Sequence, residues 1–374
     1  MTRTHRHSVS VRLAIIGAGK VAAEHHVPGI AHDPRCELVA ICDTNEQLVN
    51  RRQAQWQVSL ATSRPERIIS DPDIDGVIIA TPNASHAPLA LAAIAAGKHV
   101  MCEKPLGLSV AEAATMFKAA RAAGIVHMTA FTYRFAPAMR YLRMLVQSGD
   151  LGEPRHFRSQ RFLDWPETSW GWRQSKALAG AGDLYDMTIH RIDFGLDLLG
   201  PIDRICGALE RFCLRGQTED GAACESSDVD DWSCLLGRFV NGATGVWEGT
   251  TLAKGYHMGG VGHDWAEVNG STGTAIYRLG KAHSLLLGKP GKGLEDVAVP
   301  ENLLTPAGSP RDPQGQPAAV GFRQDLIWEF VSAIREGRDA APSFADGWQA
   351  QVIADAAIQS DLSGSWVEIP RQKP

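Results

Sequence analysis

A glycine-rich turn near the start of the chain constrains the fold more than any other feature. Val11–Ile16 is a short apolar run typical of a buried strand, and Gly17-Ala-Gly19-Lys-Val-Ala22 follows it directly. Between a strand and a helical stretch, this Gly-x-Gly-x-x-Ala spacing is typical of dinucleotide-binding units. Gly17 allows the tight turn, Gly19 lets the backbone approach a pyrophosphate, and Ala22 keeps helix and strand close. The amides at the helix start would then face the phosphates.

A carboxylate after the second expected strand indicates which dinucleotide binds. Leu38–Cys42 is the strand candidate, and Asp43 follows it at the ~20-residue spacing expected after the glycine turn. A carboxylate there can bind both ribose hydroxyls and repels a 2′-phosphate. No arginine follows directly, because Arg51 and Arg52 lie about two turns down the next helix. The sequence therefore predicts NAD rather than NADP.

Strand and helix patterns continue to alternate up to residue 131. Gly76–Ala80, His99–Cys102 and Ile125–Phe131 are strand candidates. Helices are expected over 87–96 and from the N-cap Ser109 to residue 123, with Glu112 completing a capping box. Alternation at this spacing predicts a doubly wound parallel sheet.

The strand over 99–102 ends at Glu103-Lys104-Pro105. Pro105 cannot donate to a sheet ladder, so the strand must stop and Lys104 is presented at its carboxyl end. Ligands bind at that edge of open α/β sheets. The alternative is that Glu103 and Lys104 only end the strand with solvated charge.

The pattern changes after Phe135. A helix is expected over 138–148, followed by runs of alternating residues over 155–163, 231–252 and 264–279, with hairpin signals at Asn241-Gly242 and Asn269-Gly270. Residues 281–318, rich in Gly and Pro, are expected to form a loop, and two helices over 322–336 and 346–361 close the chain. The prediction is an α/β protein with a Rossmann domain over 1–131, of which 1–9 are disordered. An α+β domain over 132–374 carries a large, mostly antiparallel sheet for substrate binding and oligomerisation.

A helix expected from Gly180 to Gly200 carries a polar face with Asp186, His190, Asp193 and Asp197 at i, i+4, i+7 and i+11. A carboxylate one turn from an imidazole can orient the ring for proton transfer. The alternative is a solvated helix face with an incidental histidine.

Aromatic residues in two loops are further candidates. Trp165, Trp170 and Trp172 lie within eight residues and could pack against the C–H faces of a sugar, or else fill a seam between domains. Tyr256 and His257, in a glycine-rich loop, are weaker candidates for contact with a substrate.

Composition excludes several classes of protein. The net charge of -5 does not favour binding to nucleic acid. No apolar stretch is long enough for a signal sequence or a membrane span. The seven cysteines are scattered without a Cys-x-x-Cys pair, and the histidines are dispersed, so no metal site is expected. We expect a cytoplasmic protein.

Taken together, these motifs resemble the glucose–fructose oxidoreductase, inositol dehydrogenase and rhizopine-catabolism (Gfo/Idh/MocA) family. The matching segments are the Gly17 turn, Thr81-Pro-Asn83-x-x-His86, Glu103-Lys104-Pro105, Tyr133-Arg-Phe135, Gly180-x-Gly182-x-Leu-x-Asp186-x-x-x-His190-x-x-Asp193 and Phe330-x-x-Ala-Ile334-x-x-Gly337. Two positions depart from the family pattern, namely Thr188, often glycine, and Tyr133, often asparagine.

The resemblance implies roles for individual residues. Lys104, Asp186 and His190 would be catalytic, with Lys104 touching the nicotinamide ribose and the reacting hydroxyl. NAD contacts are expected from Gly17, Gly19, Lys20, Val21, Asp43, Thr81, Asn83, His86, Glu103, Lys104, Trp172 and Arg173. With the aromatic loop candidates Trp165, Tyr256 and His257 added, substrate contacts are expected from Lys104, Tyr133, Trp165, Asp186, His190, Tyr256 and His257.

The function expected from this resemblance is NAD-dependent oxidation of a secondary hydroxyl of a cyclic polyol or sugar, such as an inositol or a pyranose, by a homodimer or homotetramer. Two alternatives stay open. One is an enzyme that cleaves glycosides by transient oxidation with the same NAD. The other is a dinucleotide-sensing regulator, which the presence of Lys104, Asp186 and His190 disfavours.

Overall fold

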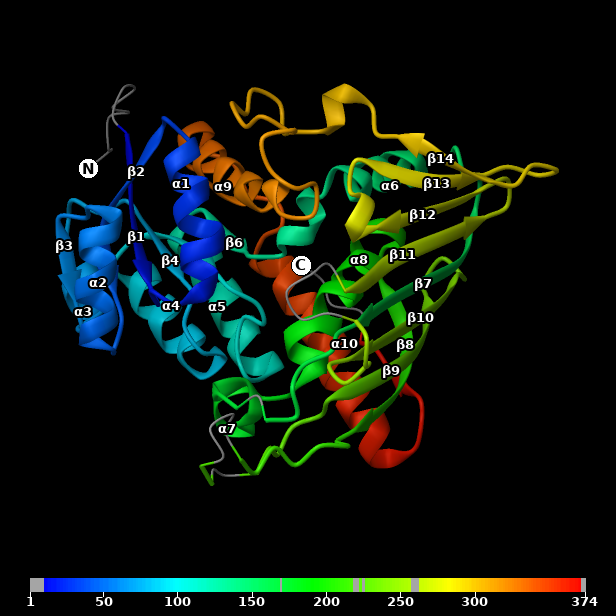
Figure 1. The fold of residues 1–374 in the computed structure, drawn as a ribbon, viewed down its shortest axis with the longest axis horizontal. Coiled ribbons are helices and arrows are strands. Elements are labelled where there is room, and N and C mark those ends of the chain that lie inside the picture. The colour runs from blue at the N-terminus through cyan, green and yellow to red at the C-terminus, as the bar shows by residue number, and fades with distance from the viewer. Residues whose placement is uncertain (1–9, 169, 218–221, 224–225, 257–261, 371–374) are drawn as a thin grey trace.

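Two β-sheets organise the chain, one parallel and one mainly antiparallel (Figure 1). The computed structural model describes residues 10–168, 170–217, 222–223, 226–256 and 262–370. The expected disorder of residues 1–9 therefore lies outside the described residues. The expected fold class, a parallel Rossmann sheet followed by a large sheet of mostly antiparallel strands, is confirmed.

The first sheet has six parallel strands in the order typical of dinucleotide-binding folds. In spatial order these are β3 (Leu60–Thr62), β2 (Cys36–Cys42), β1 (Val11–Ile16), β4 (Gly76–Ile79), β5 (His99–Cys102) and β6 (His127–Thr129). The helices between them are α1 (Val27–His32), α2 (Glu46–Trp56), α3 (Glu66–Ile69), α4 (His86–Ala95) and α5 (Val110–Ala123). Leu13 and Ile15 belong to one core cluster and Ala14 and Ile16 to another, so both faces are covered, which explains the continuous apolar run of β1.

The second sheet has nine strands. In order they are β14 (Leu294–Ala298), β13 (Ser284–Gly288), β12 (Thr274–Arg278), β11 (His263–Gly270), β7 (Pro154–Phe162), β10 (Thr244–Thr250), β9 (Trp232–Phe239), β8 (Ile202–Glu210) and β15 (Val367–Glu368). The pair β7–β10 is parallel and the other pairs are antiparallel. Asn241-Gly242 lies in the turn between β9 and β10, while Asn269 and Gly270 are the last two residues of β11, directly before the turn to β12.

Two expectations about local structure were wrong. Residues 281–318 are not all loop, because β13 and β14 extend the sheet by pairing with β12 and with each other. These short strands depend on partners that a local pattern of Gly and Pro does not reveal. At α5, Ser109 Oγ accepts from the Glu112 amide, but Glu112 Oε2 accepts from the Leu108 amide rather than from Ser109, so only half of the expected capping box forms.

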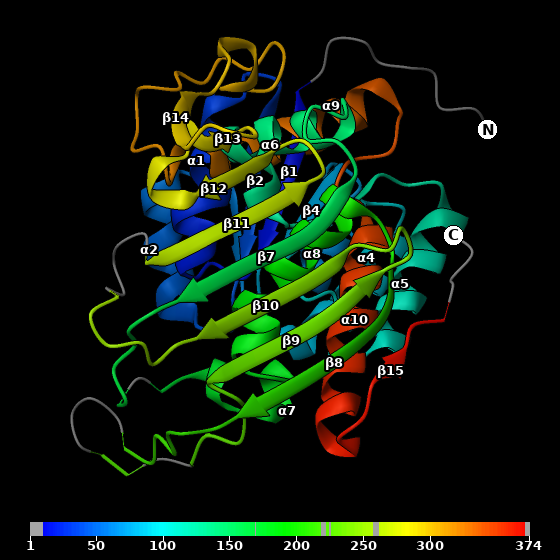
Figure 2. The same cartoon turned by 90° about the vertical axis from the view of Figure 1, so that its right-hand side faces the viewer.

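Helices cover one face of the second sheet, while the opposite face carries none (Figures 1 and 2). The covering helices are α6 (Pro137–Gln147), α8 (Ile189–Leu199) and α10 (Phe344–Ser363). The strands show the corresponding alternation of buried and half-exposed residues.

The last helices also pack against the first sheet. The Arg35 guanidinium lies 3.4 Å from the ring centroid of Trp328 in α9 (Asp325–Glu336). The Thr129 amide of β6 donates to the Pro342 carbonyl at 3.1 Å. Since α10 also packs on β8, the end of the chain contacts both sheets. Within the described residues, no helix combines the length and apolarity needed to cross a membrane.

Candidate active site

The turn after β1 fits a dinucleotide. Gly17 has φ of +99°, and a Cβ there would lie 2.3 Å from the Ala80 carbonyl oxygen, so only glycine is tolerated. A Cβ on Gly19 would meet nothing within 4 Å, which leaves the backbone open to a close-lying group. The turn therefore has the tight bend and the open cradle that a pyrophosphate requires.

Asp43 lies at the carboxyl end of β2, beside this turn. Its Oδ2 accepts from the Ala18 amide at 2.9 Å and its Oδ1 accepts from the Asn45 amide at 3.0 Å. These bonds hold the carboxylate in one orientation next to the glycine turn. The position agrees with contact to a ribose, and the expected choice of NAD over NADP at this residue stays a prediction.

Four further expected cofactor contacts differ in how exposed their side chains are. Lys20 is 83 % exposed in its side chain and lies 3.9 Å from Glu24, while Val21 and Thr81 are half-buried. His86 is fully buried, and its two ring nitrogens bond the carbonyls of Pro105 and Thr81. His86 therefore supports two turns at the sheet edge. Its expected contact with the cofactor stays a prediction.

Asn83 and Glu103 also make contacts inside the protein. The buried Asn83 amide donates to the Ala179 carbonyl at 2.8 Å and so fastens the first sheet to α7 (Lys176–Ala179). Glu103 Oε1 lies 2.8 Å from His26 Nε2. Burial alone would raise the pKa of Glu103, but the hydrogen bond and charge of His26, together with Lys104, hold it below its usual value.

Lys104 and Asp186 meet across the two parts of the fold. Lys104 follows β5, and its Nζ donates to Asp186 Oδ1 at 3.0 Å and to the Asp186 backbone carbonyl. Arg173 Nε lies 3.3 Å from Asp186 Oδ2. Burial raises the pKa of Asp186, but the charges of Lys104 and Arg173 outweigh it and lower that pKa below its ordinary value. Asp186 is therefore a carboxylate held between two cations.

The helix that carries Asp186 is not a continuous α-helix. Leu184–Thr188 forms a π-helical turn, named η5, before α8 begins at Ile189. Such turns are frequent at functional sites. The expected polar face is accordingly divided between several partners, since Asp193 and Asp197 bind Arg134 at 2.8 Å and 3.2 Å while Asp186 binds Lys104.

His190 is packed among aromatic rings. It is 4 % exposed, and its ring centroid lies 4.8 Å from that of Tyr133 and 5.7 Å from that of Phe131, both edge-on. His190 Nδ1 has no hydrogen-bond partner among the described residues. Burial, followed by the charges of Lys104 and Arg191, lowers its pKa well below the usual value, so the imidazole is neutral. Both Asp186 oxygens bind cations, and no hydrogen bond joins Asp186 to His190 within the described residues. A direct role of Asp186 in orienting this ring stays a prediction.

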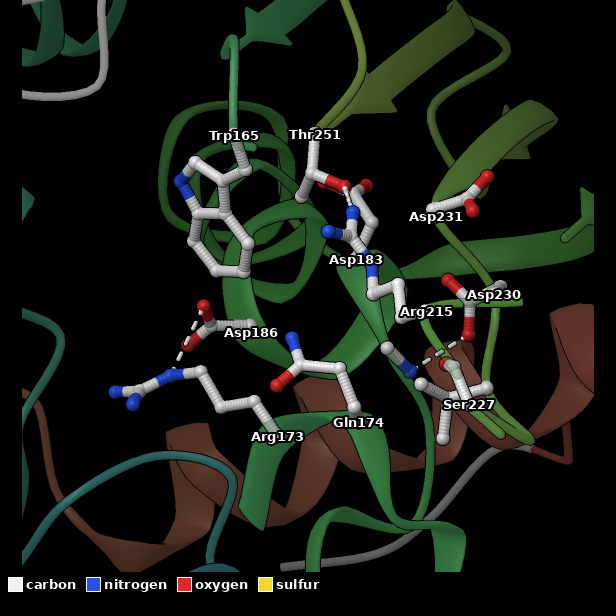
Figure 3. Close-up of a pocket in the computed structure, with 12 residues that line it drawn as sticks. Trp165, Arg173, Gln174, Asp183, Asp186, Arg215, Ser227, Asp230, Asp231 and Thr251 are labelled. Carbon is white, nitrogen blue, oxygen red and sulfur yellow. Dashed lines mark hydrogen bonds and ion pairs between the residues drawn. The ribbon is translucent and has the colours of Figure 1, made fainter. Parts of the chain in front are cut away.

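Trp165 and Asp186 line one pocket together with Arg173, Gln174 and Asp183 (Figure 3). This places three predicted residues, Trp165, Arg173 and Asp186, in one cavity. The Trp172 ring packs against the neighbouring Arg173, whose guanidinium lies 4.4 Å from the ring centroid. Tyr256 packs on Phe162 and His263, half-exposed residues of the helix-free side, and its carbonyl accepts from the Asp164 amide next to Trp165. Its expected contact with a substrate stays a prediction. His257 lies outside the described residues.

Sequence reasoning missed Asp183, which lines the same pocket. Its Oδ2 accepts from Thr188 Oγ1 at 2.8 Å and from Ser233 Oγ at 3.0 Å. Burial, with a smaller effect of Asp230, raises the pKa of Asp183 to about 7. Thr188, the departure from the family pattern, is thus part of this buried network. No sequence signal marked Asp183, because its partner Ser233 comes from the distant strand β9.

Comparisons with known proteins agree with this arrangement. Residues 11–131 match the model of an oxidoreductase family with an NAD-binding Rossmann fold, and residues 139–276 match the GFO/IDH/MocA C-terminal domain. A levoglucosan dehydrogenase from Pseudarthrobacter phenanthrenivorans is 33% identical over 355 residues, covering 88% of this chain and 89% of the relative. A myo-inositol 2-dehydrogenase from Thermotoga maritima is 28% identical, covering 63% of this chain and 67% of its own.

A solved structure resembles this chain over almost its whole length. A levoglucosan dehydrogenase in complex with NADH and levoglucosan superposes with a TM-score of 0.87 at 30% identity, covering 97% of this chain and 100% of the other. Matches to both domain models and a relative of this identity over nearly the full length leave one conclusion. The chain belongs to the GFO/IDH/MocA family of oxidoreductases, and its first sheet forms the family's NAD-binding Rossmann domain.

Proposed function

We propose that the protein is an NAD-dependent dehydrogenase that oxidises a secondary hydroxyl of a cyclic polyol or sugar. The observation that carries this proposal is the juxtaposition of an anchored ammonium, Lys104, with a buried neutral imidazole, His190. Lys104 follows β5 at the carboxyl edge of the Rossmann sheet, where a dinucleotide binds, and its charge acts on the His190 imidazole.

The proposed chemistry uses these two groups for the oxygen of the substrate. Oxidation of a secondary alcohol removes a hydride from the carbinol carbon and a proton from its hydroxyl. NAD, when bound, supplies the hydride acceptor. Lys104 donates a hydrogen bond to the oxygen and stabilises the developing alkoxide. His190, neutral because of burial and the cations near it, accepts the proton.

Asp186 acts through Lys104 in this proposal. Its Oδ1 and its backbone carbonyl hold the ammonium in place, so little reorganisation is needed when charge develops on the substrate. Trp165 offers an apolar ring in the lining of the polar pocket. One flat aromatic wall beside carboxylates, an amide and a hydroxyl suits a ring with an apolar C–H face and several hydroxyls.

The relatives suggest which substrates to test first. Levoglucosan and myo-inositol appear in the names of the two dehydrogenases described above, and we infer that an anhydrosugar or a cyclitol is a substrate here. The test is a screen of NADH formation at steady state against levoglucosan, inositols, aldoses and glycosides. Sustained formation of NADH with a member of this set supports the proposal. Product release from a glycoside without net NADH would support transient oxidation instead.

We further propose that the two domains divide near residue 131 and that the protein is a homo-oligomer, assembled through the second domain. The helix-free face of the nine-stranded sheet carries half-exposed or exposed apolar residues, among them Val246, Ile276 and Leu236. Faces of this kind are covered by helices or by another subunit. Trp247 lies on the other side of this sheet, fully buried against α8 with its indole N–H donating to the Arg191 carbonyl.

A further inference from the structure

We propose that Arg323 is a positioning residue of the active site, which holds the Tyr133–His190 ring pair and ties it to His25 of the NAD-binding domain. Arg323 belongs to the short helix η8 (Gly321–Gln324) that precedes α9, nearly 200 residues from Tyr133 in sequence. The inference deepens the proposed function and rests on it for the role of His190.

Arg323 bridges two segments of the site. Its Nη2 donates to Tyr133 Oη at 3.4 Å, and its guanidinium carbon lies 5.0 Å from the Tyr133 ring centroid. Its Nη1 donates to His25 Nε2 at 3.2 Å. Since a guanidinium can only donate, His25 Nε2 must accept and the ring must be neutral. Burial, and next the charge of Arg323, lower the pKa of His25 to about 3, which agrees with this.

Tyr133 in turn fixes His190. The two rings meet edge to face, with their centroids 4.8 Å apart and their planes at 87°. His190 Nδ1 has no hydrogen-bond partner among the residues that the structure describes. Packing rather than hydrogen bonding at that atom therefore sets the orientation of the imidazole. Whatever anchors the Tyr133 ring also anchors the proposed base.

The charges around the pair come from every neighbouring element. Tyr133 faces Arg323 from η8, Arg161 from β7, Arg191 from α8, and Asp264 and Tyr277 from β11 and β12. His190 faces Lys104 and the same three arginines. Although burial raises the pKa of Tyr133, the three guanidinium groups lower it to about 8.

Arg323 differs from the other two arginines in its partners. Arg161 and Arg191 both bind the buried Asp264 carboxylate, which offsets their charge. In the described part of the chain, no carboxylate lies within ion-pair distance of Arg323. Its charge is therefore the least compensated of the three, and its removal should raise the pKa of both Tyr133 and His190.

The experiment combines two titrations on purified Arg323→Gln, Arg323→Lys and a control, Arg140→Met. Arg140 is also half-buried and donates to the Leu303 carbonyl, and it is not among the main charges that act on Tyr133 or His190. The first titration follows tyrosinate absorbance without substrate. The protein has five tyrosines, so the Tyr133 signal is assigned by its loss in Tyr133→Phe. The second follows kcat/KM against pH with an active sugar.

In Arg323→Gln, we expect the Tyr133 midpoint to rise by at least one pH unit and the acid limb of kcat/KM to move to higher pH. Arg323→Lys should restore most of both shifts, and Arg140→Met should change neither. A fall in activity with both midpoints unmoved would overturn the proposal. So would a wild-type protein in which Tyr133 ionises only at its ordinary value near 10, a measurement that needs no variant to fold. The tyrosine titration uses no substrate, so its failure is distinguishable from failure of the proposed dehydrogenase activity.

Discussion

The Lys104 ammonium donates to both the side chain and the backbone carbonyl of Asp186, with Nζ 3.0 Å from Oδ1. Lys104 follows a strand of the Rossmann sheet, while Asp186 lies on a π-helical turn packed against the second sheet. Their side chains are 11% and 17% exposed, so water competes little with the pair. The Lys104 ammonium is thus held in place only when the two parts of the fold come together.

Loss of this cation tests its role directly. Lys104→Ala should raise the activation free energy for kcat by about 3–4 kcal/mol, the scale of losing one preorganised donor to a developing oxyanion. NAD should still bind, since the Gly17 turn is unchanged. Stopped-flow turnover and NADH fluorescence titration measure the two effects. The exposed Lys118→Ala serves as control and should match wild type. Equal loss of binding and turnover would contradict the assignment.

His190 should control the acid side of the pH profile. His190→Ala should lose roughly 10²–10⁴-fold in rate, as expected for a general base. Because its pKa in the folded protein is lowered, the wild-type rate should fall only well below pH 6.5, where the imidazole protonates. The exposed His32→Ala is the matched control. A wild-type kcat/KM that already falls above pH 6.5 would argue against His190 as the base.

Much of the fold follows from local patterns. The strand–turn–helix at Gly17 and the carboxylate at Asp43 need only spacing, and the structure places both at the sheet edge. Alternation of apolar residues likewise predicted β9 to β12. The short edge strands β13 and β14 were missed because their stability comes from pairing with β12 rather than from their own sequence.

The partners in the site were harder to predict than its members. The sequence pointed to Lys104, Asp186 and His190, but a helical spacing of i, i+4 suggested that Asp186 supports His190. The π-helical turn and the two cations, which come from other segments, direct Asp186 elsewhere. His86 matched the family motif, but it is fully buried and its ring nitrogens contact two backbone carbonyls. Arg323 carried no signal, because only the tertiary fold brings it to Tyr133.

Asp43 should determine the choice of cofactor. Asp43→Ala removes the repulsion against a 2′-phosphate, so the ratio of kcat/KM for NAD to that for NADP should fall by about tenfold or more. Wild type should prefer NAD. Asp71→Ala, a half-buried carboxylate on the turn after α3, serves as control. A wild-type preference for NADP of tenfold or more would refute the assignment.

Asp183 should make stability depend on pH. Its folded pKa of about 7 lies above its ordinary value of 3.8, so the folded state holds a proton that the unfolded state loses. Its contribution to stability is therefore fully present below about pH 4 and is lost as pH rises through about 7. Asp183→Asn keeps an acceptor for Thr188 and cannot ionise. It should be more stable than wild type at pH 8 by at least about 1 kcal/mol and similar at pH 4. Urea unfolding at both pH values measures this, and equal differences at the two would contradict it.

The exposed sheet face should carry the contact between subunits. Leu236 is 47% exposed there, opposite the half-buried Val246 on the neighbouring strand. Light scattering of wild type at micromolar concentration should give a dimer or a tetramer. Leu236→Glu places a charge where a second sheet would exclude water, so it should shift the mass toward the monomer without unfolding the chain. The control Leu362→Glu changes a leucine that is 82% exposed at the end of α10 and should leave the mass unchanged. A wild-type protein that is monomeric under these conditions would refute the proposed assembly, and an oligomer unaffected by Leu236→Glu would place the contact on another face.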